Sequence, residues 1–114
     1  MPEATCKSED HRQDNRHVAE LPLCERAAGI FAALGDPRRL QLLSLLHGGE
    51  MCVSEIADAL SDNLPAVSQR LKLLRGESIV SSRRAGKHVY YSLDDQHVVD
   101  LVSNALAHAE EHRR

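Results

Sequence analysis

The hydrophobic positions of this chain follow the three-to-four-residue spacing of amphipathic helices over most of its length. Helices are predicted over residues 23–34, 37–47, 53–60, 64–75 and 95–111. Asp36 before Pro37, and Asn63 before a helix with proline in its first turn, are typical N-caps. The Gly48-Gly49 pair is a typical helix end. The pattern therefore predicts a mainly helical chain.

The same spacing predicts which side of each helix faces the core. On the helix 37–47 the expected core positions are Leu40, Leu43, Leu45 and Leu46. On the helix 64–75 they are Val67, Leu71 and Leu74. This leaves small polar and basic residues on the outer side of that helix: Ser68, Gln69, Arg70 and Lys72.

Residues 79–84 and 88–93 are rich in β-forming side chains and flank the turn sequence Ala85-Gly86, which predicts a β-hairpin. Its tip is basic, with Arg83, Arg84, Lys87 and His88. Two short helices joined by a tight turn describe a helix-turn-helix, and a basic hairpin directly after it describes a wing. The predicted fold class is thus mainly α with a small β-hairpin, a winged helix-turn-helix.

This arrangement is typical of proteins that bind double-stranded DNA. Ser68 and Gln69 are expected to bond base edges, and Arg70 and Lys72 to reach phosphates. The tip of the hairpin is expected to lie along the DNA backbone or minor groove. The alternative for the helix pair alone is an ordinary helical hairpin with a solvated polar face, but the basic hairpin favours DNA.

Composition limits the interpretation further. A chain of 114 residues fits one small domain, and residues 1–20 lack apolar periodicity, so we expect a mobile arm before a domain at 21–114. The net charge of −3 argues against nucleic acid, yet residues 70–88 hold six Lys or Arg and one Glu. The three cysteines have no framework spacing, which indicates a reducing cytoplasm. No apolar run is long enough to span a membrane.

Two histidines mark the ends of the last predicted helix. His97 and His108 are eleven positions apart, which places them on nearly one stripe but roughly 16 Å apart. One metal ion cannot bind both within one chain, because metal–nitrogen bonds are about 2 Å long. Two antiparallel copies would bring His97 and Asp95 of one chain to His108 and Glu111 of the other. A two-fold axis would then create two sites of two imidazoles and two carboxylates, a set that suits zinc or cobalt.

The position of Asp95 decides whether such a site can form. His108 and Glu111 face one way on a helix because they are three positions apart. Asp95 and His97 are about 200° apart on an ideal helix, so they converge only if Asp95 precedes the first turn as a cap. The alternative is that Asp95 only caps, the histidines are polar interface residues and Glu111 is solvated.

The chain resembles the ArsR/SmtB family of metal-responsive winged-helix repressors in five segments: ALGDPRRLQLLSLL, MCVSEIADAL, PAVSQRLKLLR, RRAGKHVYYSL and the terminal D-x-H-x10-H-x2-E. The resemblance covers roughly residues 24–112 and implies a homodimer formed through the terminal helices. It assigns a zinc site, which cobalt is also expected to occupy, to Asp95, His97, His108 and Glu111. It further implies that the metal-free dimer binds an operator and that metal weakens this binding, which releases genes for efflux or sequestration.

The resemblance also points to a second metal site, formed by the third helix and the arm. Cadmium- and lead-sensing relatives carry a C-x-C pair there, whereas this chain has Cys52-Val53-Ser54. A mixed site for cadmium or lead remains open, with the ligands Cys6, Cys52, Glu55, Asp10 and His11. A buried structural thiol is the other interpretation of Cys52, and the favoured one.

Three alternative functions follow from the same residues. A thiol-based redox-sensing repressor would use Cys6, Cys24 and Cys52. A zinc hydrolase is disfavoured because four protein ligands close the shell that a catalytic zinc keeps open, so we expect neither enzyme activity nor a small-molecule substrate. A metal buffer would bind zinc and show no affinity for DNA.

Overall fold

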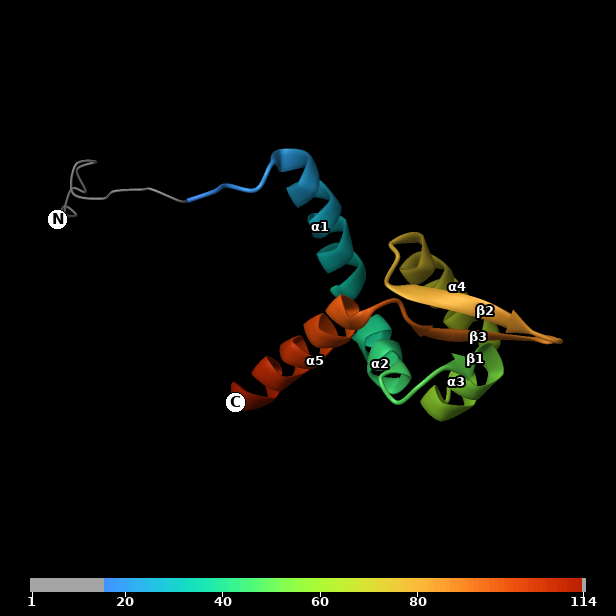
Figure 1. Ribbon diagram of the computed structural model, residues 1–114. Coiled ribbons are helices and arrows are strands. Elements are labelled where there is room, and N and C mark those ends of the chain that lie inside the picture. The colour runs from blue at the N-terminus through green and yellow to red at the C-terminus, as the bar shows by residue number, and fades with distance from the viewer. Residues whose placement is uncertain (1–15, 114) are drawn as a thin grey trace, which may run out of the picture.

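The computed structural model describes residues 16–113, in which five helices accompany a three-stranded antiparallel sheet (Figure 1). The elements are α1 (Leu21–Leu34), α2 (Pro37–Leu46), β1 (Met51–Cys52), α3 (Val53–Leu60), α4 (Leu64–Gly76), β2 (Val80–Ala85), β3 (His88–Leu93) and α5 (Gln96–Glu111). Each predicted helix and the predicted hairpin are present, with ends that differ by at most two residues. The expected winged helix-turn-helix is therefore confirmed.

Local side chains determine where three of the helices begin. Asp36, Asn63 and Asp95 each accept the backbone N–H three residues further on, at 3.0, 2.8 and 3.0 Å. Each of these residues has an extended backbone, as an N-cap requires. The predicted caps of α2, α4 and α5 are confirmed.

The sheet has the strand order β1-β3-β2. The strands β2 and β3 pair from Val80 and Leu93 at the base to Ala85 and His88 at the tip. The short strand β1 pairs with the other edge of β3, with Met51 opposite Tyr91. The sequence did not predict β1, because two residues are too few to show an alternating pattern.

The turn from α4 to β2 contains a residue in a left-handed conformation. Ser78 has φ 58°, and the N–H groups of Ser78 and Ile79 bond the carbonyls of Arg75 and Leu74 at 3.0 and 2.9 Å. Glycine is the usual residue in this conformation, since a side chain there is strained. Serine in place of glycine makes this helix end a locally unfavourable one.

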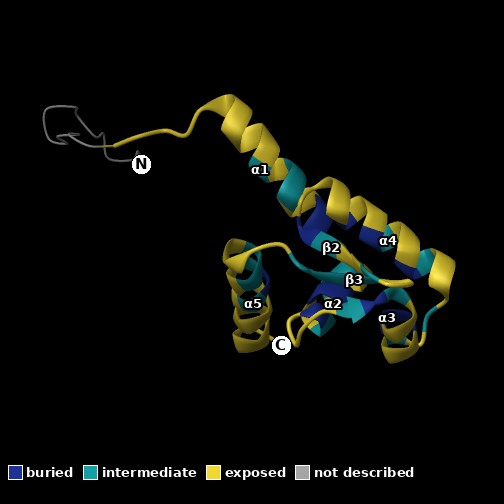
Figure 2. Cartoon of the chain, turned by 45° about the vertical axis from the view of Figure 1, so that its right-hand side comes forward, coloured by how far each residue is buried: buried dark blue, intermediate teal, exposed yellow. Residues whose placement is uncertain are grey.

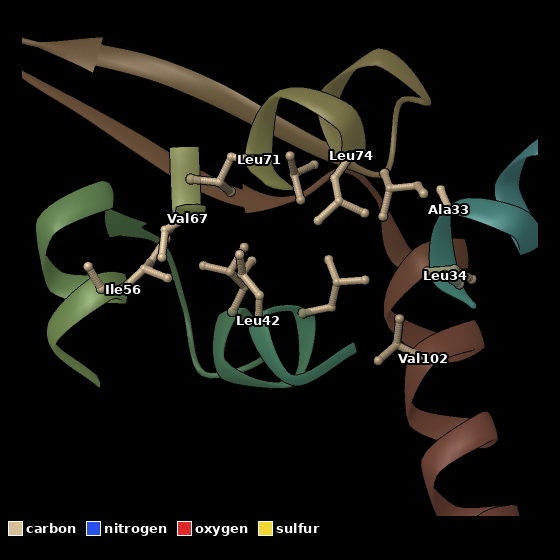
Figure 3. Packing of buried hydrophobic residues seen from close by; sticks show 13 residues of the cluster. Ala33, Leu34, Leu42, Ile56, Val67, Leu71, Leu74 and Val102 are labelled. Atoms are coloured by element: carbon tan, nitrogen blue, oxygen red, sulfur yellow. The ribbon is translucent and has the colours of Figure 1, made fainter. Parts of the chain in front are cut away.

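One hydrophobic core joins α2, α3, α4 and the base of the sheet, and it includes Ala33 and Leu34 at the end of α1 and Val102 on α5 (Figure 3). Val67, Leu71 and Leu74 anchor α4 in it, as predicted. The prediction for α2 was partly wrong. Leu42 is fully buried, whereas Leu40 and Leu45 are only partly buried at the edge of the core. Leucine occupies five of the ten positions in α2, so apolar side chains cover more of the helix surface than the core can bury.

The terminal helices α1 and α5 extend away from this core, on the side opposite the tip of the hairpin (Figure 1). Most of their surface is exposed (Figure 2). Phe31 on α1 is 60% exposed and Leu106 on α5 is 40% exposed. No helix in residues 16–113 is long and apolar enough to cross a membrane.

Candidate nucleic-acid interface and metal centre

Helix α4 presents its polar side to solvent because its apolar side is held in the core. Ser68, Gln69 and Lys72 are exposed, as predicted. A groove between α4 and the sheet is lined by Ser68, Leu71, Lys72, Arg75, Gly76 and Tyr91. Arg75 was missed in the sequence, although it lies seven positions after Ser68 and hence on the same side of the helix. This groove carries two basic side chains, Lys72 and Arg75, and the hydroxyl-bearing side chains Ser68 and Tyr91.

Arg70 is the exception on α4. Its guanidinium donates a 2.7 Å hydrogen bond to the Asp62 carboxylate and is only partly exposed. This bond, together with the N–H of Asn63, lowers the pKa of Asp62 below its usual value. Arg70 thus ties α4 to the turn before it, and a phosphate would have to compete with Asp62 for it.

The tip of the hairpin carries exposed basic residues on both strands. Gly86 has φ 63°, a conformation that lets the two-residue turn close. Arg84, Lys87 and His88 are exposed, and the ion pairs found among residues 16–113 involve neither Arg84 nor Lys87. The charges of Arg84 and Lys87 are therefore available to an anionic partner.

Arg83 differs from these neighbours because it is paired within the chain. Its guanidinium donates two hydrogen bonds to Glu50, one of them at 2.9 Å from Nε to Oε2, and lies 5.0 Å from the centre of the Tyr90 ring. The pair lowers the pKa of Glu50 and raises that of Arg83. Sequence reasoning missed Glu50, which lies 33 positions away from Arg83.

At the start of α5 the structure brings Asp95 and His97 together. One oxygen of Asp95 caps the helix, and the other lies 3.6 Å from Nδ1 of His97. The backbone of Asp95 is extended, with φ −156° and ψ −178°, so the two side chains converge as the sequence predicted. His97 is 97% exposed and thus free to meet a partner.

The other predicted ligands, His108 and Glu111, lie exposed at the far end of α5. Within residues 16–113 of one chain, no three His, Cys, Asp or Glu side chains come together as a metal-binding group. The two predicted pairs are thus at opposite ends of one helix, and only a second chain can unite them. Their assignment as ligands remains a prediction.

The predicted second site is described only in part. Cys52 is buried and is the N-cap of α3, where its N–H donates a 2.9 Å hydrogen bond to Glu55. The same N–H lowers the pKa of Glu55. Cys52 and Glu55 therefore both help to cap α3. The arm residues Cys6, Asp10 and His11 lie outside the described residues, and Cys24, the other described cysteine, is exposed.

The elements described so far define a class of protein. Helices α3 and α4, a hairpin with free basic residues and an exposed polar side of α4 make up a winged helix-turn-helix DNA-binding domain. Residues 36–82 match the model of the "Bacterial regulatory protein, arsR family".

Individual relatives agree with this match. The chain is 41% identical to the "Transcriptional repressor SmtB homolog" of Synechocystis over 103 residues, which are 90% of this chain and 78% of that protein. It is 36% identical to the regulator NmtR of Mycobacterium tuberculosis, with 88% of this chain and 87% of NmtR aligned. Mb0332 of Mycobacterium bovis, solved as a homodimeric winged helix-turn-helix DNA-binding domain, superimposes with a TM-score of 0.80 at 32% identity, over 90% of this chain and 94% of the other. The chain belongs to the ArsR family of bacterial transcriptional regulators, and it is a DNA-binding regulator rather than an enzyme.

Proposed function

We propose that this protein is a homodimeric, zinc-sensing transcriptional repressor whose operator affinity falls when metal binds. The metal site is formed twice per dimer, by Asp95 and His97 of one chain with His108 and Glu111 of the other. The observation that carries the proposal is the geometry of α5, in which one pair is already converged and the other lies at the opposite end. Names of similar proteins, such as a cadmium resistance regulatory protein of Staphylococcus aureus, support metal sensing in general.

The terminal helices support the dimer. Four large apolar side chains on α1 and α5 are exposed in one chain, and a second copy would bury them. They are Leu21, Leu23, Phe31 and Leu106. Dimerisation through these helices would also place two copies of α4 on one DNA duplex, as a two-fold operator requires.

The donor set at α5 fits zinc. Two imidazoles and two carboxylates are ligands that zinc takes in tetrahedral sites, and cobalt fits the same set. When bound, zinc supplies a fixed link between side chains of two helices that belong to different chains. Asp95 holds its position by capping α5, so His97 has an oriented neighbour before any metal arrives.

Metal binding changes the affinity for DNA only if the dimer has two conformations and the metal binds one of them more tightly than the other. A coupling free energy of about 1–3 kcal/mol changes DNA affinity roughly 5- to 150-fold. Because α5 follows β3 directly and contacts α2, a shift of the α5 pair would move the two DNA-binding domains relative to each other. The genes released would serve metal efflux or sequestration.

The test is DNA binding by the full chain, measured by fluorescence anisotropy on DNA from its own promoter, with and without zinc. The wild type is expected to lose affinity within the range above, and His97→Ala to bind DNA without responding to zinc. Cys52→Ser is the matched control and should respond like the wild type. A zinc response that survives His97→Ala and disappears in a folded Cys52→Ser dimer would place the regulatory site at α3 instead.

A further inference from the structure

Helix α4 is flanked by two grooves, and both carry basic side chains. The groove toward the sheet contains Lys72 and Arg75. A second groove lies between α4 and the start of α2, and its volume of about 320 Å³ leaves room for a phosphate group and several waters. The residues that line this second groove are Arg39, Ala66, Gln69, Arg70 and Leu73.

Arg39 is held in the second groove by the end of α1. Its Nε donates a 2.6 Å hydrogen bond to the carbonyl of Ala33, and its Nη2 donates a 3.3 Å hydrogen bond to the carbonyl of Ala32. These carbonyls orient the guanidinium without neutralising its charge, and the ion pairs found among residues 16–113 do not include Arg39. A guanidinium has five N–H donors, so donors remain after these two bonds. Arg39 is therefore an oriented cation in a groove that Gln69 also lines.

The charged groups around this groove leave it positive. Arg70 donates a hydrogen bond to Asp62 and is the main cause of the lowered pKa of that carboxyl, which the charge of the exposed Arg38 lowers further. Asp36 accepts the backbone N–H of Arg39 at 3.0 Å. Three arginines thus stand against two aspartates, and each aspartate already accepts a hydrogen bond. A positive groove attracts an anion such as a phosphate.

The dimensions of DNA give the two grooves different partners. A helix with its side chains is about 10–12 Å across and the major groove is about 12 Å wide, so a helix in that groove lies between two phosphate backbones. Tyr91 of the hairpin lines the groove on one side of α4, so the hairpin and this groove face one backbone. Arg39 lines the groove on the other side of α4, together with Gln69 and Leu73. The start of α2 therefore faces the second backbone.

We propose that the groove between α2 and α4 binds a DNA phosphate, with Arg39 as its main ligand, on the backbone that the hairpin does not face. Contacts on both sides then hold α4 in the major groove. Phosphate contacts of this kind fix the position and orientation of a protein on the duplex and carry no sequence information directly. The inference concerns DNA binding alone, so it stands or falls independently of the proposed metal site.

The competing role for Arg39 is purely structural, as a side chain that binds the last carbonyls of α1 and joins α1 to α2. The two roles differ in how DNA affinity depends on salt. Each phosphate that a protein neutralises releases counterions, so each contact adds about 0.9 to the slope of log affinity against log salt. Loss of a structural bond can weaken DNA binding, but it leaves that slope unchanged.

The experiment measures DNA binding by the full chain in the presence of a chelator, by fluorescence anisotropy over a series of salt concentrations. The probes are a duplex from its own promoter and a random duplex of the same length. Arg39→Gln is expected to lower the slope by about 1 on both duplexes. Arg113→Gln is the matched control, because Arg113 follows α5, far from α4, and pairs with Glu110 (Figure 1). Its slope should equal that of the wild type.

A second pair of variants tests the groove without touching the bonds of Arg39. Leu73 is 43% exposed and lines the groove, so Leu73→Glu places a negative charge there, and Leu73→Gln removes the same leucine without adding charge. Leu73→Glu is expected to bind both duplexes more weakly than Leu73→Gln does. If Arg39→Gln does not form a folded dimer, this pair decides the question.

Three outcomes overturn the inference. The first is a wild-type slope for a folded Arg39→Gln dimer, even where its affinity is lower, since Arg39 would then only join α1 to α2. The second is an equal loss of slope in Arg113→Gln, which would reflect total charge rather than a contact. The third is equal DNA affinity of Leu73→Glu and Leu73→Gln.

Discussion

A single chain buries most apolar side chains of the segment from α2 to β3, but it leaves many of those on the two terminal helices exposed. In the first, leucines, valines and two isoleucines bury one another, and all fully buried side chains except Val102 lie there. In the second, α1 and α5 leave large apolar residues exposed, together with the four predicted ligands of the α5 site. The DNA-binding part is therefore complete within one chain, whereas the proposed metal site needs a second chain. The proposed site would lie where bound metal could change how two DNA-binding domains are placed relative to each other.

The largest effect should be on the free energy of unfolding, from a substitution in the segment from α2 to β3. Leu42→Ala removes a side chain with no exposed surface and leaves a cavity, which should lower the free energy of unfolding by about 2–5 kcal/mol. Urea unfolding at a fixed chain concentration measures it. Leu106→Ala on α5 is the comparison, and it should cost clearly less. Equal losses would mean that a half-exposed leucine on α5 stabilises the protein as much as a fully buried core leucine does.

The next effect concerns association rather than folding. Phe31→Ala on α1 should weaken the dimer by about 1.5–3 kcal/mol, the value of burying such a side chain, or roughly 10- to 150-fold in Kd. Sedimentation equilibrium measures it. Leu64→Ala, which truncates an exposed leucine on α4, should leave the dimer unchanged. The reverse result would place the dimer interface on the DNA-binding helix and contradict dimerisation through the terminal helices.

Within the DNA-binding part, free and paired basic residues should behave differently. Lys87→Ala should weaken binding to all duplexes and reduce the slope of log affinity against log salt by about 1, because one phosphate contact is lost. Arg83→Ala should change the slope less, since Glu50 already neutralises that guanidinium. Salt titrations of DNA binding measure both. A larger change for Arg83→Ala would show that DNA displaces Glu50.

The smallest effect is on acid stability. Because the folded-state pKa of Asp62 is lowered, chiefly by Arg70, its contribution is complete above the ordinary aspartate pKa of about 3.9 and is lost as pH falls through the lower folded value. The wild type should therefore lose more stability below about pH 4 than Asp62→Asn does. Urea unfolding across this pH range tests it, with exposed Asp58→Asn as the control. Parallel pH curves for wild type and Asp62→Asn would remove the role assigned to the Arg70 pair.

Sequence reasoning succeeded where the determinant is local. The caps Asp36, Asn63 and Asp95 act on a backbone N–H three residues away, so their spacing sufficed, and the same cap geometry predicted that Asp95 and His97 converge. It failed where interacting residues are far apart in the sequence, and where more apolar positions are present than the core can bury. Nothing in the sequence links Glu50 to Arg83, and five leucines in α2 do not reveal that Leu42 is the one fully buried beside Leu43.

The proposed metal site is shared between two chains, and complementation between two single variants tests this sharing. Chains carrying His97→Ala are mixed with chains carrying His108→Ala, and zinc binding is measured against a competing chelator. Each homodimer lacks one imidazole in both of its sites, whereas the heterodimer has one complete site and one that lacks two imidazoles. A shared site predicts that mixing restores tight binding of one zinc per heterodimer. No recovery, in a sample where heterodimers are shown to form, would contradict a site built from the opposite ends of two α5 helices.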